Sequence, residues 1–402
     1  MNFELNTSQR EIQHKAQELA KFAIAPKAAH WDQTEEYPFE NVKNLVGAGF
    51  MGMNIPKEYG GPERTLIEAV LVVEEMAKVC GITGRIVVDS NMGVVGAIIR
   101  YGTEEQKRKY LPLVLNGDKP AIAITEPEAG SAATDMTTTA VLDGDHYILN
   151  GHKKWITGAG VSHVNLVFAR IVHDGVEQGI GGLIVEKGTE GFIIGKRAYM
   201  MGLRGIPETE EIFENCRVPR ENLVTIGFGR LMSAYNAQRV GAGTVALGIG
   251  QGAFECAVEY AKERHQFGRP ISEFQGLQWI LADARIQLDA ARLLLHRAAV
   301  QLDPESGFPN VHLAAIAKTF AAEAAIKVTY DALQMFGAAG YSRDLPLERM
   351  ARDVRMFTIG GGTTQAQRNV IASGIFGRKF SQRRDGTESV DGRVEAPRSV
   401  TV

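Results

Sequence analysis

The sequence predicts an α+β protein in which a β domain separates two helical regions. Helical periodicity fills residues 1 to about 118 and returns after about residue 226, whereas the stretch between is rich in Gly, Thr and Val in short alternating runs. This order predicts that the two helical parts pack together around a β insert. The expected domains are 1–118, 119–227 and 228–381, followed by a loose polar tail at 382–402.

In the N-terminal region, breaker residues mark the expected helix boundaries. Thr7-Ser8 precedes an amphipathic run to about Ala25, where Pro26 interrupts it. A second helix is expected from Phe39 to Ala48, with Gly49 as its stop. Further helices are expected over 66–80, in two glycine-punctuated pieces over 81–100, and over 103–115.

The middle region has the texture of a small antiparallel β domain. Short strand-like pieces are bounded by turns, and Asp143-Gly144-Asp145 is a hairpin signal. The expected strands include 140–142, 146–149, 165–169 and 182–185. Beyond this region, long helices are expected over 241–261, 274–301 and 312–336.

Composition excludes several classes of protein. The chain has 402 residues and 45% hydrophobic content, which suffices for a large core. A net charge of −3 gives no sign of a nucleic-acid partner, and the three scattered cysteines have no metal-binding spacing. We find no signal-peptide pattern and no run approaching ~18 uninterrupted apolar residues, so a cytoplasmic location without a membrane span is expected.

A glycine-rich stretch near the C-terminus reads Ile359-Gly-Gly-Gly-Thr-Thr-Gln365. Three successive glycines leave the backbone bare where a flat or charged ligand can come close. Thr363 and Gln365 add a hydroxyl and an amide beside that opening. Because a glycine triplet can also simply reverse the chain, it indicates a ligand site only together with other motifs.

This stretch resembles the Tyr-Glu-Gly-Thr-x-Gln motif of the acyl-CoA dehydrogenases. Thr125-Glu-Pro-Glu-Ala-Gly-Ser131 and Asn150-Gly-His-Lys-Lys-Trp-Ile-Thr157 are similar to that family's flavin-binding loop and strand. Arg264-His-Gln-Phe-Gly-Arg-Pro-Ile271 and Gln334-Met-Phe-Gly-Ala-Ala-Gly340 are similar to its adenosine-side elements. The resemblance spans nearly the whole chain. It implies an N-terminal helical domain, a middle antiparallel β domain and a C-terminal four-helix bundle.

The resemblance further implies that FAD is bound between subunits of a homotetramer, or at least of a dimer. Trp155 would stack by the flavin and Thr157 would bond its N5 region, whereas Arg264 would reach the pyrophosphate in a neighbouring subunit. Without the family, Trp155 is interpreted as a core residue and Arg264 as a solvated charge. The implied FAD contacts are Ile122, Ile124, Thr125, Ser131, Trp155, Thr157, Arg264, Phe267, Gln275, Gln334, Gly337, Ala338, Gly361, Thr363 and Gln365.

The catalytic carboxylate of the family is missing. In relatives a Glu commonly removes the α-proton of the acyl thioester, and Gly361 stands in its place here. In a minority of members the base precedes a family Arg on another helix, where this chain has Gln238 before Arg239. No Asp or Glu occurs in 222–254 or in 354–384. Because a general base needs a titratable group, we expect α,β-dehydrogenation to be very slow.

Arg85 lies in an otherwise apolar segment, Gly84-Arg-Ile-Val-Val-Asp-Ser-Asn91. Its planar guanidinium suits two-point binding of a carboxylate-like anion. It can equally pair with Asp89, four residues further on. The loss of both usual carboxylates favours the anion receptor, since buried like charges repel.

Together these features are similar to one branch of the family, the 3-sulfinopropanoyl-CoA desulfinases. The resemblance implies hydrolytic loss of the sulfino group to give propanoyl-CoA and sulfite, with FAD bound but no net oxidation. Arg85 would hold the sulfinate, and Gln238 would orient the acyl group or a water. The implied substrate contacts are Arg85, Ser131, Tyr235, Asn236 and Arg239.

Two other functions stay open on the sequence. One is an FAD-dependent dehydrogenase for a short or anionic acyl-CoA, with a base from a distant segment. The other is a non-catalytic scaffold that binds flavin or CoA. Bleaching of the flavin by substrate would indicate the dehydrogenase, and intact FAD motifs without turnover would indicate the scaffold.

Overall fold

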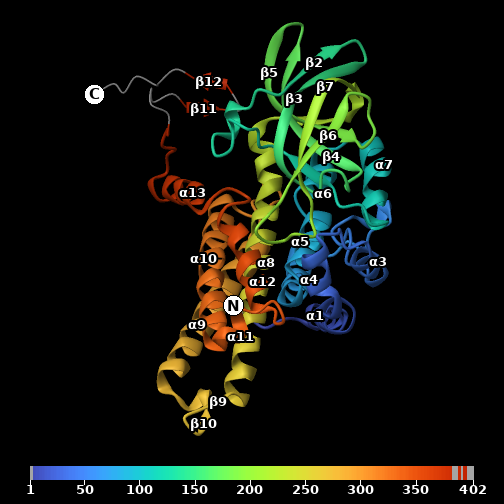
Figure 1. Ribbon diagram of the computed structural model, residues 1–402. Coiled ribbons are helices and arrows are strands. Elements are labelled where there is room, and N and C mark those ends of the chain that lie inside the picture. The colour runs from blue at the N-terminus through green and yellow to red at the C-terminus, as the bar shows by residue number, and fades with distance from the viewer. Residues whose placement is uncertain (1–2, 383–387, 391–392, 396–402) are drawn as a thin grey trace, which may run out of the picture.

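The computed structural model describes residues 3–382, 388–390 and 393–395. Figure 1 shows a β domain at one end, the N-terminal helices beside it, and a bundle of long helices that extends to the opposite end. The helices–strands–helices order predicted from the sequence is confirmed.

The N-terminal region is mainly helical. Its first helix ends at Leu19 and continues as a π-helical turn to Ile24, so the α-helix is shorter than the run to about Ala25 that the sequence predicts. Gly49, with φ +73°, ends α3, and α5 and α6 are separate pieces around Gly93. The start of the first helix also differs, because it is capped by Asn6, whose side chain accepts from the backbone N of Gln9, rather than by Thr7 or Ser8. The helices are α1 (Thr7–Leu19), α2 (Ala28–Thr34), α3 (Phe39–Ala48), α4 (Leu66–Val79), α5 (Gly81–Asn91), α6 (Val94–Tyr101) and α7 (Glu104–Leu115).

The middle region forms one sheet with the strand order β6-β7-β3-β2-β4-β5-β8, and β1 pairs with β4. The hairpin predicted at Gly144-Asp145 joins β2 to β3. The domain is mainly antiparallel, as expected, and the exceptions are β1 and β2, which both pair with β4 in parallel. The strands are β1 (Ala121–Ala123), β2 (Thr139–Asp143), β3 (His146–Thr157), β4 (Val164–His173), β5 (Val176–Glu186), β6 (Phe192–Ala198), β7 (Glu208–Pro219) and β8 (Leu223–Ile226).

The C-terminal region contains three long helices, α8 (Phe228–Glu263), α9 (Gln275–Val300) and α10 (Val311–Phe336). The fourth member expected for the bundle is broken into α11 (Ala338–Tyr341), α12 (Leu347–Val354) and α13 (Thr364–Phe376). The glycine triplet lies between the last two, where Gly361 and Gly362 both have positive φ. Between α8 and α9, the two-residue strands β9 (His265–Gln266) and β10 (Arg269–Pro270) form the far tip of the bundle (Figure 1).

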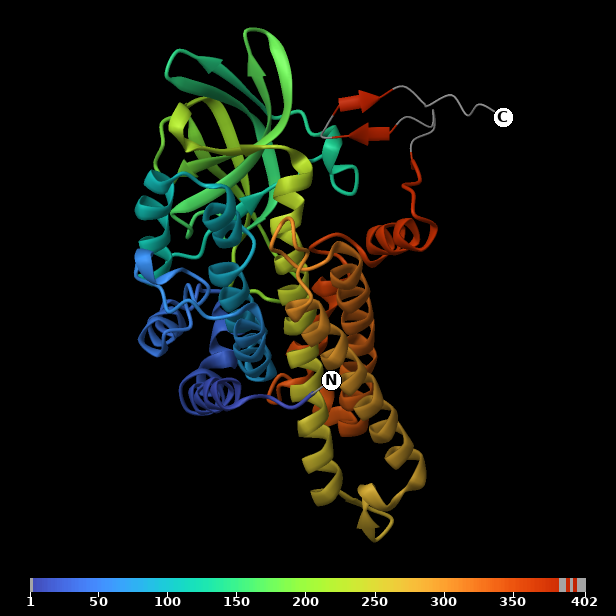
Figure 2. The same ribbon diagram turned by 180° about the vertical axis from the view of Figure 1, so that it is seen from behind.

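Helix α8 connects the three regions. It starts beside the β domain and runs past the N-terminal helices to the far tip, as Figure 2 shows from behind. Its middle is fully buried, and α4 approaches it so closely that a Cβ on Gly252 would lie 2.1 Å from the carbonyl oxygen of Lys78. Near the start of α8, Leu231 lies against Gly182 on β5 and Gln238 bonds Asp89 on α5.

The C-terminal tail and the apolar stretch 81–101 differ in how much of each the structure describes. Within the tail predicted as loose, β11 (Glu388–Val390) and β12 (Arg393–Glu395) pair antiparallel, and most of the other tail residues lie outside the described part. In the described ranges, one helical stretch, 81–101, is apolar and long enough to cross a membrane by those two criteria alone. Its apolar window is 89% buried inside the protein, as α5 and α6.

Candidate active site

Arg85 and Asp89 form a buried ion pair on α5. Arg85 Nε lies 3.0 Å from Asp89 Oδ2, and the two side chains are only 7% and 4% exposed. The spacing of four residues places both on one face of the helix. The pairing that the sequence left open is therefore present.

Two further side chains reach the same carboxylate from distant parts of the chain. Lys119 Nζ lies 3.0 Å from Asp89 Oδ2, and Gln238 Nε2 on α8 donates to Oδ1. Lys119 also donates to the carbonyl oxygen of Thr157 at 3.0 Å. Gly158 leaves room for this ammonium, because a Cβ there would lie 2.3 Å from Nζ.

A small cavity opens between these groups and has room for about one water molecule. It brings together three regions, since its lining comes from α5, from the start of the β domain and from α8. The lining residues are Arg85, Asp89, Met92, Val94, Pro120, Ile122, Thr157 and Gln238. Four residues predicted from separate motifs, Arg85, Ile122, Thr157 and Gln238, are thus neighbours.

Asp89, beside this cavity, pairs with two cations, Arg85 and Lys119. Burial alone would raise the pKa of Asp89, but Arg85 and Lys119 outweigh it and hold that pKa below its ordinary value. The cluster of Arg85, Lys119 and Asp89 therefore carries two positive charges and one negative charge. Such a site favours a guest with one negative charge.

Glu208, at the start of β7, is an acid that the sequence analysis did not single out. It is the register partner of Thr157 across β3 and β7, and Thr157 Oγ1 donates to its Oε1 at 2.7 Å. Burial raises the pKa of Glu208 to about 7, against the opposing effects of Thr157, Arg85 and Lys119. Both protonation states are therefore populated near neutral pH.

The predicted substrate contacts on α8 face the glycine triplet. Arg239 Nη1 donates to Asn236 Oδ1 at 2.6 Å, its guanidinium lies 5.5 Å from the centre of the Tyr235 ring, and Nε donates to the carbonyl oxygen of Gly361 at 3.4 Å. From α10, buried Lys318 donates to the carbonyl oxygen of Gly362 at 2.7 Å. Two cations thus hold the backbone at the position where relatives carry a Glu.

The flavin-loop and flavin-strand motifs also meet. The backbone N of Lys154 donates to the carbonyl oxygen of Thr125 at 2.9 Å, and Lys153 Nζ donates to that of Ile124 at 3.0 Å. Trp155 remains 51% exposed, which contradicts the alternative that it is a core residue. Ser131 is exposed on the neighbouring loop, away from the residues that line the cavity.

The predicted adenosine-side residues lie elsewhere in the chain. Gln238 and Arg264 are 26 positions apart on or at the end of α8, which corresponds to ~39 Å along a helix. Arg264 is exposed, and Phe267 is 93% exposed at the far tip. One chain therefore does not bring the two groups together. The residues remote from the cavity are Arg264, Phe267, Gln275, Gln334, Gly337 and Ala338.

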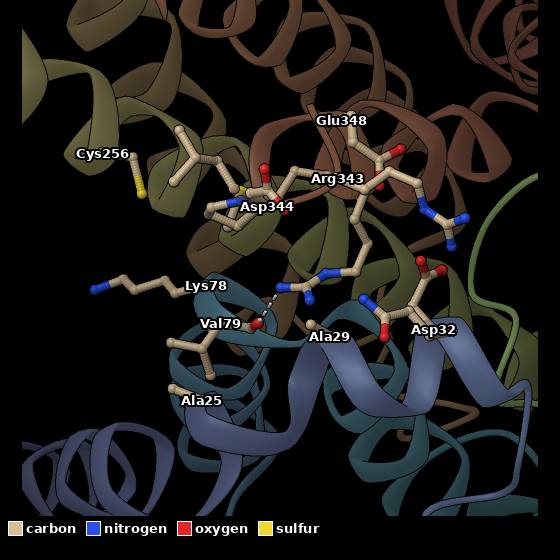
Figure 3. Close-up of a pocket in the computed structure, with 14 residues that line it drawn as sticks. Ala25, Ala29, Asp32, Lys78, Val79, Cys256, Arg343, Asp344 and Glu348 are labelled. Carbon is tan, nitrogen blue, oxygen red and sulfur yellow. Dashed lines mark hydrogen bonds between the residues drawn. The ribbon is translucent and has the colours of Figure 1, made fainter. Parts of the chain in front are cut away.

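A second cavity lies between the N-terminal helices and the segment before α12 (Figure 3). Acidic and basic groups both line it, and Arg349 Nη2 donates to the carbonyl oxygen of Val79 at 3.2 Å. None of the residues predicted for substrate or flavin lines this cavity.

Comparison with known proteins identifies the family. Models of the N-terminal, middle and C-terminal domains of acyl-CoA dehydrogenases match residues 6–118, 121–216 and 225–376. The chain belongs to the acyl-CoA dehydrogenase family. Butyryl-CoA dehydrogenase from Megasphaera elsdenii has a solved structure that matches with a TM-score of 0.89 and 34% identity, over 94% of this chain and 100% of that one.

Two curated relatives are more similar in sequence. The 3-sulfinopropanoyl-CoA desulfinase of Variovorax paradoxus is 56% identical over 97% of this chain and 100% of its own. The protein of the same name from Cupriavidus necator is 56% identical over 96% of this chain and 99% of its own.

An acyl-CoA dehydrogenase family member is expected to hold FAD, and the side chains here suit that group. The half-exposed Trp155 offers an aromatic ring that Lys154 Nζ approaches to 5.2 Å from its centre, and Thr125 and Thr157 lie beside it through the paired backbone. Thr363 caps α13 by accepting from the backbone N of Ala366 at 3.1 Å, which leaves Gln365 exposed at the helix N-terminus.

Sequence reasoning missed three site residues or their roles. Lys119 marked only a domain boundary, Asp89 only an alternative partner of Arg85, and Glu208 was not considered. A lysine in a linker and a glutamate after a Gly-Ile-Pro turn have no local signature. Only the fold brings Lys119 to the Asp89 carboxylate and Glu208 to Thr157.

Proposed function

We propose that this protein is an FAD-containing 3-sulfinopropanoyl-CoA desulfinase. It converts its substrate and water into propanoyl-CoA and sulfite, and no electrons leave the substrate. Two desulfinases that match it over nearly the full length of both chains are 56% identical to it. The single structural observation that carries the proposal is the buried cluster of Arg85, Lys119 and Asp89, with one excess positive charge in a pocket that lacks both usual catalytic carboxylates.

Arg85 is the proposed anchor for the sulfinate. It bonds Asp89 through Nε, and in the described part of the chain neither Nη atom has a hydrogen-bond partner. These two donors are free to take two sulfinate oxygens in the fork geometry of guanidinium–oxyanion pairs. Asp89 fixes the orientation of the fork, and Lys119 supplies the second positive charge.

Gln238 is proposed to orient a water molecule or the acyl group, and its amide carries no titratable proton. Its Nε2 is held by Asp89, and its Oε1 lies where a Cβ on Gly93 would approach to 2.7 Å. The amide oxygen therefore faces the entrance to α6 and can accept from the water for which the cavity has room. Arg239, with Tyr235 and Asn236, is proposed to bind the thioester side of the substrate.

FAD, when bound, supplies an electron-poor ring system beside the acyl chain. The residues that would hold that ring are Trp155 and the paired backbone of Thr125 and Lys154. The proposed contacts on the pyrophosphate and adenine side are Arg264, Phe267, Gln275, Gln334, Gly337 and Ala338.

The proposed assembly is a cytoplasmic homotetramer with FAD shared between subunits. The ~39 Å between the cavity and Arg264 along α8 exceeds what one dinucleotide can span, so the two groups of contacts would complete different flavin sites. Light scattering of wild type and Arg264→Ala, with FAD quantified, tests this. Loss of FAD without loss of the oligomer is expected.

The test of the function is a product balance. Purified protein with 3-sulfinopropanoyl-CoA, and no electron acceptor, should release sulfite and propanoyl-CoA in equal amounts. Turnover only with an added acceptor, or without sulfite, would contradict the proposal.

A dehydrogenase for an anionic acyl-CoA is the second candidate. Glu208 favours it, because this carboxyl comes from a distant segment and is bonded to Thr157. Succinyl-CoA would then bleach the flavin anaerobically.

A further inference from the structure

Glu208 holds a fixed position behind Thr157, which lines the cavity. Before it, the backbone N of Gly158 donates to the carbonyl oxygen of Pro207 at 2.8 Å, which fixes the turn to the end of β3. The hydrogen bond from Thr157 Oγ1 then sets the carboxyl itself. Because Thr157 lines the cavity with Arg85 and Gln238, the carboxyl is one hydrogen bond from the cavity wall.

Charged and titratable groups face Glu208 from three other elements. Arg85 and Asp89 act on it from α5, Lys119 from the start of the β domain, and Tyr235 from α8. The pKa of Tyr235 is itself raised by burial, so that phenol stays neutral at ordinary pH. The Glu208 carboxyl therefore interacts electrostatically with Arg85, the proposed sulfinate anchor.

We propose that Glu208 is the proton carrier of the reaction, as general acid towards the β-carbon and as general base towards water. This inference rests on the desulfinase function. It assigns to Glu208 a step that Arg85 and Gln238, which bind and orient, do not perform.

The proton balance of the step is closed. As the C–S bond breaks, its electron pair goes to the β-carbon, which takes the proton of Glu208 and becomes the methyl group of propanoyl-CoA. The sulfino group leaves as sulfur dioxide. Water adds to the sulfur, loses a proton to the Glu208 carboxylate, and gives hydrogen sulfite. Substrate and water are consumed, and the carboxyl returns to its starting form without an oxidant or a reductant.

The other groups at the cavity are poorly suited to this role. Asp89 is bound by Arg85, Lys119 and Gln238, and its lowered pKa keeps it ionised. Gln238 has no titratable proton. Glu208, with a pKa of about 7, exists in both forms near neutral pH, which is the condition for giving and retaking a proton.

The test compares Glu208→Gln with Glu210→Gln. Glu210 lies on the same face of β7 and pairs with His152 and Lys154 instead, so it is a matched control. Sulfite release is measured against pH, together with KM, FAD content and melting temperature. We expect Glu208→Gln to lower kcat about 100-fold or more with KM within a few-fold and FAD retained. The control should behave as wild type.

The pH profile separates a proton carrier from a structural residue. The donor form is lost as pH rises through about 7, so wild-type kcat should fall on that side, and this limb should be absent in Glu208→Gln. Glu208→Asp, which keeps a carboxyl, should retain part of the activity and a titrating limb, and it serves if the Gln variant does not fold.

Three results would overturn the inference. These are a wild-type kcat in Glu208→Gln, a loss confined to KM or FAD content, or an unchanged alkaline limb in Glu208→Gln. Failure of the proposed function is a different result, because wild-type protein itself would then release no sulfite.

Discussion

The amide nitrogen of Gln238 donates a hydrogen bond to the Asp89 carboxylate across 149 positions of the chain. The bond joins α8 to α5 at the position where a minority of relatives carry their base. A carboxylate at 238 would face Asp89 directly, and two buried carboxylates in contact cannot both stay ionised. The neutral amide of Gln238 therefore lets Asp89 stay ionised and orient Arg85.

Replacement of Arg85 by Lys should keep the positive charge and remove the two-point donor geometry of the guanidinium. We expect kcat/KM for sulfite release to fall about 10- to 100-fold, since a charge-assisted hydrogen bond contributes ~1.5–3 kcal/mol. Arg100→Lys, at an exposed bond to the carbonyl oxygen of Glu305, is the matched control and should change little. Equal rates for the two variants would contradict the role of Arg85.

Replacement of Asp89 by Asn should destabilise the protein. It leaves Arg85 and Lys119 buried without a counter-charge, and breaking such a pair costs ~3–5 kcal/mol. Asp289→Asn removes a half-exposed acid that pairs with Arg285 and Arg292, and it should cost less than ~1 kcal/mol. Thermal unfolding of both variants checks this, and similar melting temperatures would argue against the buried cluster.

Gly361→Glu should return a carboxylate to its place in the family. A Cβ there meets only Lys318 Cε, at 4.0 Å, although φ of +72° strains any side chain. We expect KM for the anionic substrate to rise at least ~10-fold, because like charges repel in a buried site. Gly361→Gln carries the same strain without the charge. If both variants lose activity equally, size rather than charge excludes the Glu.

The fold could be predicted from periodicity and breakers because those are local properties. Gly49 ends α3 and Gly144-Asp145 turns β2 into β3 as expected. The parallel pairing of β1 and β2 with β4 could not be predicted. Alternation of apolar and polar residues shows which side chains share a face of a strand, but not which strands lie next to it.

The site was predictable where residues sit in motifs. Thr157 and Gln238 were found this way, and the structure places both at the cavity with Arg85. Lys119 and Glu208 were not found, because their roles depend on burial and on contacts with residues that are far away in the sequence. The sequence shows directly that position 361 has no carboxylate. It does not show that β7 places the Glu208 carboxylate beside Thr157.

Glu211 predicts a pH dependence of stability separate from catalysis. It is fully buried, and neither carboxyl oxygen has a hydrogen-bond partner in the described part of the chain. Burial raises its pKa to about 8, despite Lys153 nearby. Between about pH 4.5 and 8 the folded protein keeps this proton and the unfolded chain does not. Stability should therefore fall as pH rises through that window, by up to ~1.4 kcal/mol per pH unit.

Glu211→Gln should remove this slope, so the variant gains stability relative to wild type from pH 5 to pH 8. Melting temperatures across that range measure it. Glu210→Gln, on the opposite face of the same strand from Glu211, should track wild type. A constant difference between Glu211→Gln and wild type at every pH would show that Glu211 is ionised in the fold.

The central claim is desulfination without oxidation, and one anaerobic measurement tests it most directly. Sulfite release from 3-sulfinopropanoyl-CoA is followed while the flavin spectrum is recorded in the same cuvette. We expect one sulfite for each substrate consumed, with the flavin oxidised throughout. Bleaching of the flavin by this substrate or by succinyl-CoA, without sulfite, would contradict it and would make the protein a dehydrogenase.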